Sequence, residues 1–128
     1  MHVTTVGLVT LTEAKHYLAS IGIEYTLPPL NAINYSNVPH QYNIAYQQET
    51  PVGILITTTQ TNDVVHLSVD TEENYLEVGK TLLHATQVKQ VLARTEDTEL
   101  NTLLNYAGYR LTEDLVKFKL YRKSFLIQ

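Results

Sequence analysis

His66 is the residue of this sequence that a reaction at neutral pH would use most directly. It lies in Val64–Asp70, where Val65, Leu67 and Val69 alternate with His66, Ser68 and Asp70. An imidazole with a pKa of about 6.5 accepts a proton from an amine, directly or through a water molecule. The same alternation is the ordinary pattern of a half-buried strand. His66 is therefore either a general base or a strand residue without a chemical role.

Several other kinds of site are excluded by composition and spacing. The sequence has no cysteine, which rules out disulfides, thiolate zinc sites and cysteine nucleophiles. Its five histidines show no metal-ligand spacing, so we predict no metal site. Gly79-Lys80-Thr81 lacks the upstream glycine that a phosphate-binding Walker loop requires, because position 74 is asparagine.

The charge of the chain argues against nucleic acid as a partner. A net charge of -4 removes the overall attraction to a phosphate backbone. No stretch approaches about 18 consecutive apolar residues, and Met1–Thr10 has no basic segment followed by a long apolar run. We therefore expect a cytoplasmic protein with no membrane and no nucleic-acid partner, and the lack of cysteine fits a reducing compartment.

Hydrophobic periodicity predicts strands on both sides of His66. They are Val3–Val9, Gln41–Gln48, Val52–Thr59, Val64–Asp70, Val91–Thr95 and Leu115–Phe125. Glu49–Pro51 has the length of a hairpin loop between the second and third strands. The chain length and a hydrophobic content of 44% predict a single domain over residues 1–128.

Three helices are predicted from apolar residues at helical spacing and from residues that typically begin and end helices. The first spans Thr10–Gly22, the second has Leu76, Gly79, Leu82 and Leu83 on one side and ends near Ala85 or Thr86, and the third spans Asp97–Gly108. Thr10 and Glu13 have the spacing of a capping box. We place Gly79 at the start of the second helix, after the acidic loop Thr71–Asn74. Prolines and asparagines in Ile23–His40 predict an ordered loop, which is either a binding loop or a plain connection.

The last predicted strand is basic, with Lys117, Lys119, Arg122, Lys123 and Tyr121 set against Val116, Phe118 and Leu120. Lysines of this kind either contact nucleic acid or protect an exposed sheet edge from aggregation, and we favour edge protection. The apolar Phe125–Ile127 either covers the core of the domain or contacts a second subunit in a homodimer.

The order of these elements and four short phrases resemble the GNAT N-acetyltransferase superfamily. The phrases are Pro51–Leu55, Leu67–Asp70, Val78–Leu83 and Leu104–Tyr109, and the resemblance runs from Gln41 onward. It implies an α/β fold with a central, mostly antiparallel sheet and helices on both faces. The chain is accordingly identified as a divergent member of the superfamily.

The resemblance also implies a co-substrate, acetyl-CoA, and a set of site residues. The backbone of Leu67 and Val69 would hold the acyl group and the pantetheine arm. Val78, Gly79 and Lys80 would hold the pyrophosphate, because backbone amides at a helix start bind anions. His66 would be the base, and Gly79→Glu would then abolish cofactor binding and leave the fold intact.

Two departures from the family pattern affect this site. The family begins the helix with Gln or Arg, any two residues, Gly, any one, then Gly or Ala; here Asn74–Gly79 keeps only the last glycine, and Glu77 replaces the first. Glu72, Glu73 and Glu77 either repel phosphate or interact favourably with the helix dipole. The family's tyrosine acid falls on Leu104, so Tyr106 is the nearest phenol and is either an acid or a half-buried tyrosine packed on the sheet.

Two functions follow from these residues. The first is an acetyl-CoA-dependent N-acetyltransferase that transfers the acetyl group directly to a small-molecule or peptide amine in a ternary complex. The second is a GNAT-like binding or regulatory domain without catalysis, since a fold does not guarantee its usual chemistry.

Overall fold

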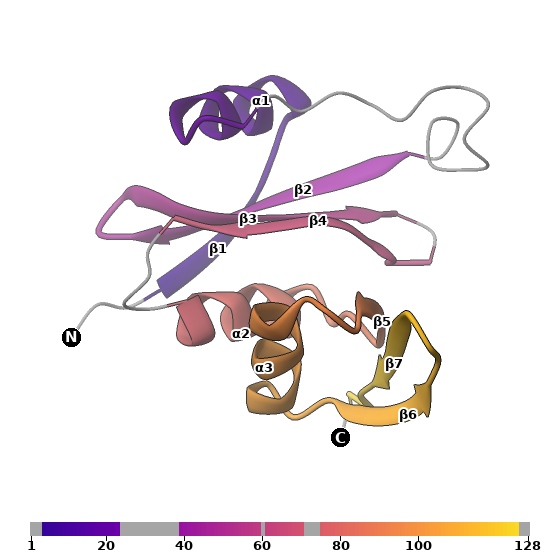
Figure 1. The fold of residues 1–128 in the computed structure, drawn as a ribbon. Coiled ribbons are helices and arrows are strands. Elements are labelled where there is room, and N and C mark those ends of the chain that lie inside the picture. Colours follow the sequence, from indigo (N-terminus) through magenta and orange to yellow (C-terminus); the bar gives the residue numbers. More distant parts are fainter. Residues whose placement is uncertain (1–3, 24–38, 60, 71–74, 126–128) are drawn as a thin grey trace.

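The computed structural model describes residues 4–23, 39–59, 61–70 and 75–125 (Figure 1). The elements are β1 (Thr4–Val9), α1 (Leu11–Ser20), β2 (His40–Gln47), β3 (Thr50–Thr58), β4 (Val64–Val69), α2 (Tyr75–Ala85), β5 (Gln90–Arg94), α3 (Thr98–Tyr106), β6 (Arg110–Asp114) and β7 (Phe118–Arg122). Most of the predicted loop Ile23–His40, and the acidic loop Thr71–Asn74 with Glu72 and Glu73, lie outside the described residues.

The strands form two antiparallel sheets, one in the order β1-β2-β3-β4 and one in the order β5-β7-β6. Helix α1 covers one face of the four-stranded sheet, and α2 and α3 lie on the other face (Figure 1). The predicted fold class, a mainly antiparallel α/β arrangement with helices on both faces, is therefore confirmed. The structure adds that the sheet is divided between β4 and β5.

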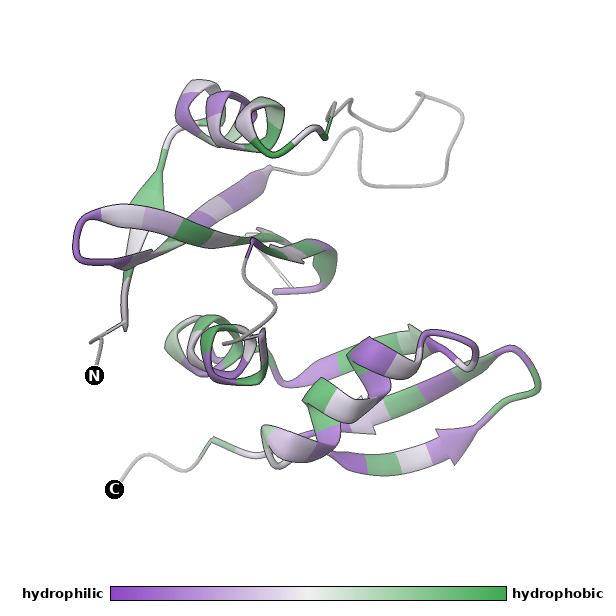
Figure 2. Ribbon diagram, turned by 60° about the vertical axis from the view of Figure 1, so that its left-hand side comes forward, coloured by the Kyte–Doolittle hydropathy of each residue, from purple (hydrophilic) through white to green (hydrophobic). Residues whose placement is uncertain are grey.

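Each face of the four-stranded sheet has its own hydrophobic cluster. On one face, Ala14, Tyr17 and Leu18 of α1 pack against Ile44, Ile54 and Ile56. On the other face, α2 and α3 pack with β5 and β7 against Ala45 and Leu55, so this cluster joins the two sheets. In the three-stranded sheet, hydrophobic and hydrophilic residues alternate along the central strand β7, whereas β6 is mostly hydrophilic (Figure 2).

The predicted helix boundaries are confirmed at their caps. The Thr10 hydroxyl accepts a hydrogen bond of 3.2 Å from the Glu13 amide, and the Asp97 carboxylate accepts one of 3.1 Å from the Leu100 amide. Gly22 and Gly108 follow α1 and α3 with φ of 83° and 90°. Positive φ is the conformation in which glycine commonly ends a helix.

The β2–β3 hairpin is tighter than predicted. Its turn is the residue pair Gln48 and Glu49, both at positive φ, and not Glu49–Pro51. Pro51 instead lies inside β3, opposite Tyr46 and next to a register shift. A β-bulge is one of the few places where a strand accepts proline, because proline has no N–H to donate.

The prediction of one last strand over Leu115–Phe125 is correct only for Phe118–Arg122, which form β7. The preceding residues Arg110–Asp114 form an additional strand, β6, which pairs with β7 in a hairpin, and Val116 lies in its turn, where 94% of the residue is exposed. Tyr121, predicted on the exposed lysine side, is buried in the core and donates a hydrogen bond of 2.6 Å to Asn101. The strand β6 was missed because all of its residues are exposed, which leaves no apolar alternation in the sequence.

Strand β4 also departs from simple alternation. A register shift between Ile56 and Thr57 places Val65 with the cluster under α1, whereas Leu67 and Val69 pack with the opposite cluster. The bulge therefore reverses the facing of the strand just before His66. None of the helices in the described part of the chain has the length and apolar character needed to cross a membrane.

Candidate functional site

One edge of β4 is open. The strand pairs with β3, and no other described strand pairs with it. The Asp70 amide donates a hydrogen bond of 2.7 Å to the Val52 carbonyl of β3. Because backbone groups of successive residues in a strand point to opposite edges, the N–H and C=O groups of Leu67 and Val69 face the open edge. These are the two residues that the resemblance assigned to the acyl and pantetheine arm.

A groove of about 1030 Å³ lies along this open edge. Its walls come from the end of α1, from β4, from the first turn of α2 and from one face of α3. The lining residues are Ile21, Ile23, Leu67, Ser68, Val69, Asp70, Tyr75, Leu76, Glu77, Thr98, Glu99, Thr102 and Tyr106. The groove is thus the place where the divided sheet is accessible to a ligand.

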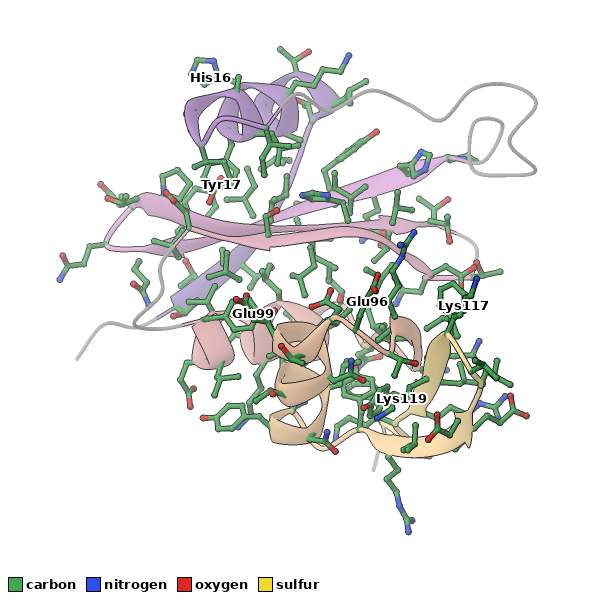
Figure 3. The ribbon with its side chains drawn as sticks, viewed as in Figure 1. His16, Tyr17, Glu96, Glu99, Lys117 and Lys119 are labelled. Carbon is green, nitrogen blue, oxygen red and sulfur yellow. The ribbon has the colours of Figure 1, made fainter. Side chains whose placement is uncertain are left out.

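The polar lining of the groove is acidic. Asp70, Glu77 and Glu99 contribute carboxylates, and no lysine or arginine is among the described lining residues. Glu99 lies on the side of α3 that faces the four-stranded sheet (Figure 3). Burial, together with the charges of Asp97 and Glu99, raises the pKa of Tyr75 to about 12. The electrostatic potential at this end of the groove is therefore negative.

Tyr106 lines the groove but is bound to a carboxylate. Its hydroxyl donates a hydrogen bond to Glu77 of α2, and the Lys80 ammonium lies 5.3 Å from its ring centroid. The residue is 43% exposed, so it is more accessible than the half-buried tyrosine of one sequence interpretation. Leu104, at the position of the family's tyrosine, is fully buried in the core.

His66 lies on the α1 side of β4 together with Ser68, because both are paired with residues of β3 that face α1. Its Nε2 and the Ser68 hydroxyl share a hydrogen bond of 2.6 Å. Ser68 lines the groove, and His66 contacts the groove wall through it. Desolvation by burial lowers the pKa of His66 below 6.5, which keeps the ring neutral at pH 7.

This lowered pKa predicts a pH dependence of stability. The unfolded chain binds a proton at His66 more readily than the folded chain, so stability is lost as the pH falls from 6.5 through the folded pKa. His66→Gln, which can still bond to Ser68, should lose less stability than the wild type between pH 7.5 and pH 5.5. Urea unfolding at the two pH values measures this difference, and equal losses in both proteins would contradict it.

The helix residues assigned to the pyrophosphate lie deeper in α2 than predicted. Gly79 is the fifth residue of the helix and is buried with Val78. A Cβ on Gly79 would lie 2.6 Å from a methyl carbon of Leu103, so the glycine permits the close approach of α2 and α3. The amides that point beyond the helix belong to Tyr75, Leu76 and Glu77 in its first turn. Lys80 lies one turn further along.

Sequence reasoning missed several groove residues. Glu99 was not singled out, although an acid in the first turn of a predicted helix was a visible signal. One face of α3 lines the groove and carries Thr98, Glu99, Thr102 and Tyr106. The helical period of the sequence places these residues on one face, but only the structure shows that this face is open. Among the described residues, no group of three His, Cys, Asp or Glu side chains could hold a metal ion.

Neither protein-family models nor curated proteins match this sequence. Solved structures, however, match the fold over almost the whole chain. Arabidopsis thaliana Naa50, in complex with the bisubstrate analogue CoA-Ac-MVNAL, is 13% identical with a TM-score of 0.61, covering 95% of this chain and 99% of that one. The Campylobacter jejuni N-acetyltransferase PseH, in complex with acetyl coenzyme A, is 9% identical with a TM-score of 0.56, covering 95% and 100%.

A third match is the ribosomal-protein-S18-alanine N-acetyltransferase from Escherichia coli, 10% identical with a TM-score of 0.55, covering 93% of this chain and 90% of that one. Identities this low show the fold alone. The fold of this chain is thus similar to that of these N-acetyltransferases, and the GNAT fold implied by the resemblance is confirmed.

Proposed function

We propose that this chain, which has the fold of the GNAT N-acetyltransferases, is an acetyl-CoA-dependent N-acetyltransferase acting on a small-molecule or peptide amine. The observation that carries the proposal is the open edge of β4, where the Leu67 and Val69 backbone faces a groove. Naa50 and PseH, which share the fold, are complexed with a CoA bisubstrate analogue and with acetyl coenzyme A.

The open edge suits the acyl-donor arm of acetyl-CoA. Pantetheine is an extended chain with two amides, and an extended chain that lies beside a free strand edge exchanges backbone-type hydrogen bonds with it. Leu67 and Val69 offer N–H and C=O groups at the strand spacing. An amide N–H directed at the thioester carbonyl also stabilises the negative charge that develops on its oxygen during acyl transfer.

His66 and Ser68 supply the proton acceptor in this proposal. The amine nitrogen attacks the thioester carbonyl carbon, the C–N bond forms, and the C–S bond breaks with release of the CoA thiolate. The proton of the amine passes to the neutral His66, through Ser68 or a water molecule. The lowered pKa keeps His66 in its proton-accepting form at neutral pH.

The first turn of α2, where the pyrophosphate of acetyl-CoA would bind, fits that group less well than β4 fits the pantetheine arm. This favours the second candidate function, a binding domain without catalysis. The first-turn amides of α2 are suited to an anion, but Glu77 lies among them and Asp70 and Glu99 line the same groove. Lys80 is directed at Tyr106 and does not line the groove. Like charges at short range oppose the binding of a pyrophosphate.

Thermal unfolding with and without acetyl-CoA tests the proposal. A ligand at 100 times its dissociation constant stabilises the folded state by about 2.7 kcal/mol, so a clear rise in Tm is expected at millimolar acetyl-CoA. Desulfo-CoA with an added amine serves as the control for phosphate binding without acyl transfer. If neither the wild type nor the double variant Glu77→Gln/Glu99→Gln shows a shift in Tm, the enzymatic function is rejected and the non-catalytic binding domain remains.

A further inference from the structure

A second groove lies at the other end of the α2–α3 layer, where three segments meet. It measures about 620 Å³ and lies between the start of β5, the connection from α3 to β6, and the end of β7. It shares no lining residue with the groove at β4. The function proposed above makes no use of it.

Four basic side chains converge on this second groove. They are Lys89, Arg110, Arg122 and Lys123. The chain has 9 lysines and arginines and a net charge of -4, so this concentration of positive charge runs against its overall acidity. No carboxylate is among the described lining residues, and none of the four forms an ion pair with a described residue.

The sheet register forces two of these charges together. Arg122 of the central strand β7 is directly opposite Arg110 of β6, and directly opposite Gln90 of β5. Residues in such positions share a face, and like charges directly opposite each other destabilise a sheet. Gln90 accepts a hydrogen bond of 3.1 Å from Arg122 but brings no compensating charge.

Lys123 is also held in place. Its ammonium lies 5.7 Å from the Phe125 ring centroid, and a Cβ on Gly108 would lie 2.9 Å from its Nζ. A side chain at position 108 would therefore require the ammonium to shift, and the glycine leaves room for it where it lies. The Lys123 amide donates a hydrogen bond of 2.9 Å to the Lys89 carbonyl, which brings the two lysine positions to one end of the groove.

We propose that this basic groove binds an oligophosphate, meaning two or more linked phosphate groups. Two guanidinium groups offer paired donors that match phosphate oxygens, and the two lysines add point charges. A compact anion with several charges would also relieve the repulsion between Arg110 and Arg122. An extended nucleic acid fits less well, because it would continue past the groove over a protein of net negative charge.

Titration calorimetry with sodium triphosphate at low ionic strength tests the proposal. Arg110→Gln and Arg122→Gln should each weaken binding by at least about tenfold. Arg94→Gln makes the same change on an exposed arginine of β5 outside the groove and should leave affinity within about twofold. Thermal unfolding without ligand shows that each variant is folded.

One further ligand, a nucleoside triphosphate, identifies the source of the phosphates. A nucleoside triphosphate that binds as tightly as triphosphate supports a nucleotide ligand, and weaker nucleotide binding supports a free oligophosphate. The proposal is overturned if triphosphate does not bind, if Arg110→Gln binds it unchanged, if inorganic monophosphate binds equally well, or if a single-stranded oligonucleotide binds more tightly. Val69→Pro, which alters the other groove, should leave triphosphate binding intact.

Discussion

Val69→Pro should reduce acetyl transfer by about 100-fold and remove most of the stabilisation by acetyl-CoA, without unfolding the protein. The Val69 amide faces the open edge of β4, because the next amide, that of Asp70, bonds to β3. Proline removes this N–H, and one lost donor to a developing oxyanion costs about 10²–10³ in rate. The sheet loses no hydrogen bond, which is why edge strands accept proline at such positions.

Val69→Ala is the matched control for this prediction. It shortens a side chain that packs partly on the core but keeps the amide that faces the groove. Its Tm should fall slightly, and its response to acetyl-CoA should remain close to that of the wild type. The role of the open edge would be refuted if Val69→Pro kept its activity, or if Val69→Ala lost as much activity as Val69→Pro.

Gly79→Glu should strongly destabilise the domain. Position 79 is buried between α2 and α3, and even a Cβ there would lie 2.6 Å from Leu103. A glutamate at this position adds bulk to a packed interface and buries a carboxylate without a partner, so we expect a loss of at least about 3 kcal/mol. Circular dichroism during urea unfolding measures it. The sequence-based expectation that this substitution spares the fold is thereby revised.

A double-mutant cycle shows whether packing is the cause. Gly79→Ala alone should destabilise by about 1–3 kcal/mol, and Leu103→Ala alone by about 2–5 kcal/mol. Together they should cost clearly less than the sum, because the smaller residue at 103 makes room for the new methyl group. Additive losses, or a fully stable Gly79→Glu, would mean that Gly79 does not separate the two helices.

Any loss of acetyl-CoA binding in Gly79→Glu therefore reports unfolding and not a blocked phosphate site. The variants that address the phosphate end directly are those of the groove carboxylates. Glu77 and Glu99 are suitable because both line the groove, and because replacing either with glutamine preserves its size.

The sequence by itself determined the local structure of this protein. Thr10, Asp97, Gly22 and Gly108 begin or end helices through contacts within a few residues, and such contacts are legible in a single sequence. Alternation identified β4 and placed His66 and Ser68 on one side of it. The open-edge direction of Leu67 and Val69 agrees with the resemblance, although their role in binding stays a prediction.

Only the tertiary structure decided which surfaces meet. The exposed strand β6 has no apolar pattern of its own and is defined by pairing with β7, which in turn buries Tyr121. Gly79 is needed because of its contact with Leu103 of another helix. The acidic groove brings together Asp70, which directly follows β4, Glu77 of α2 and Glu99 of α3. These features depend on contacts between residues far apart in the chain, whereas periodicity and capping report only on neighbours.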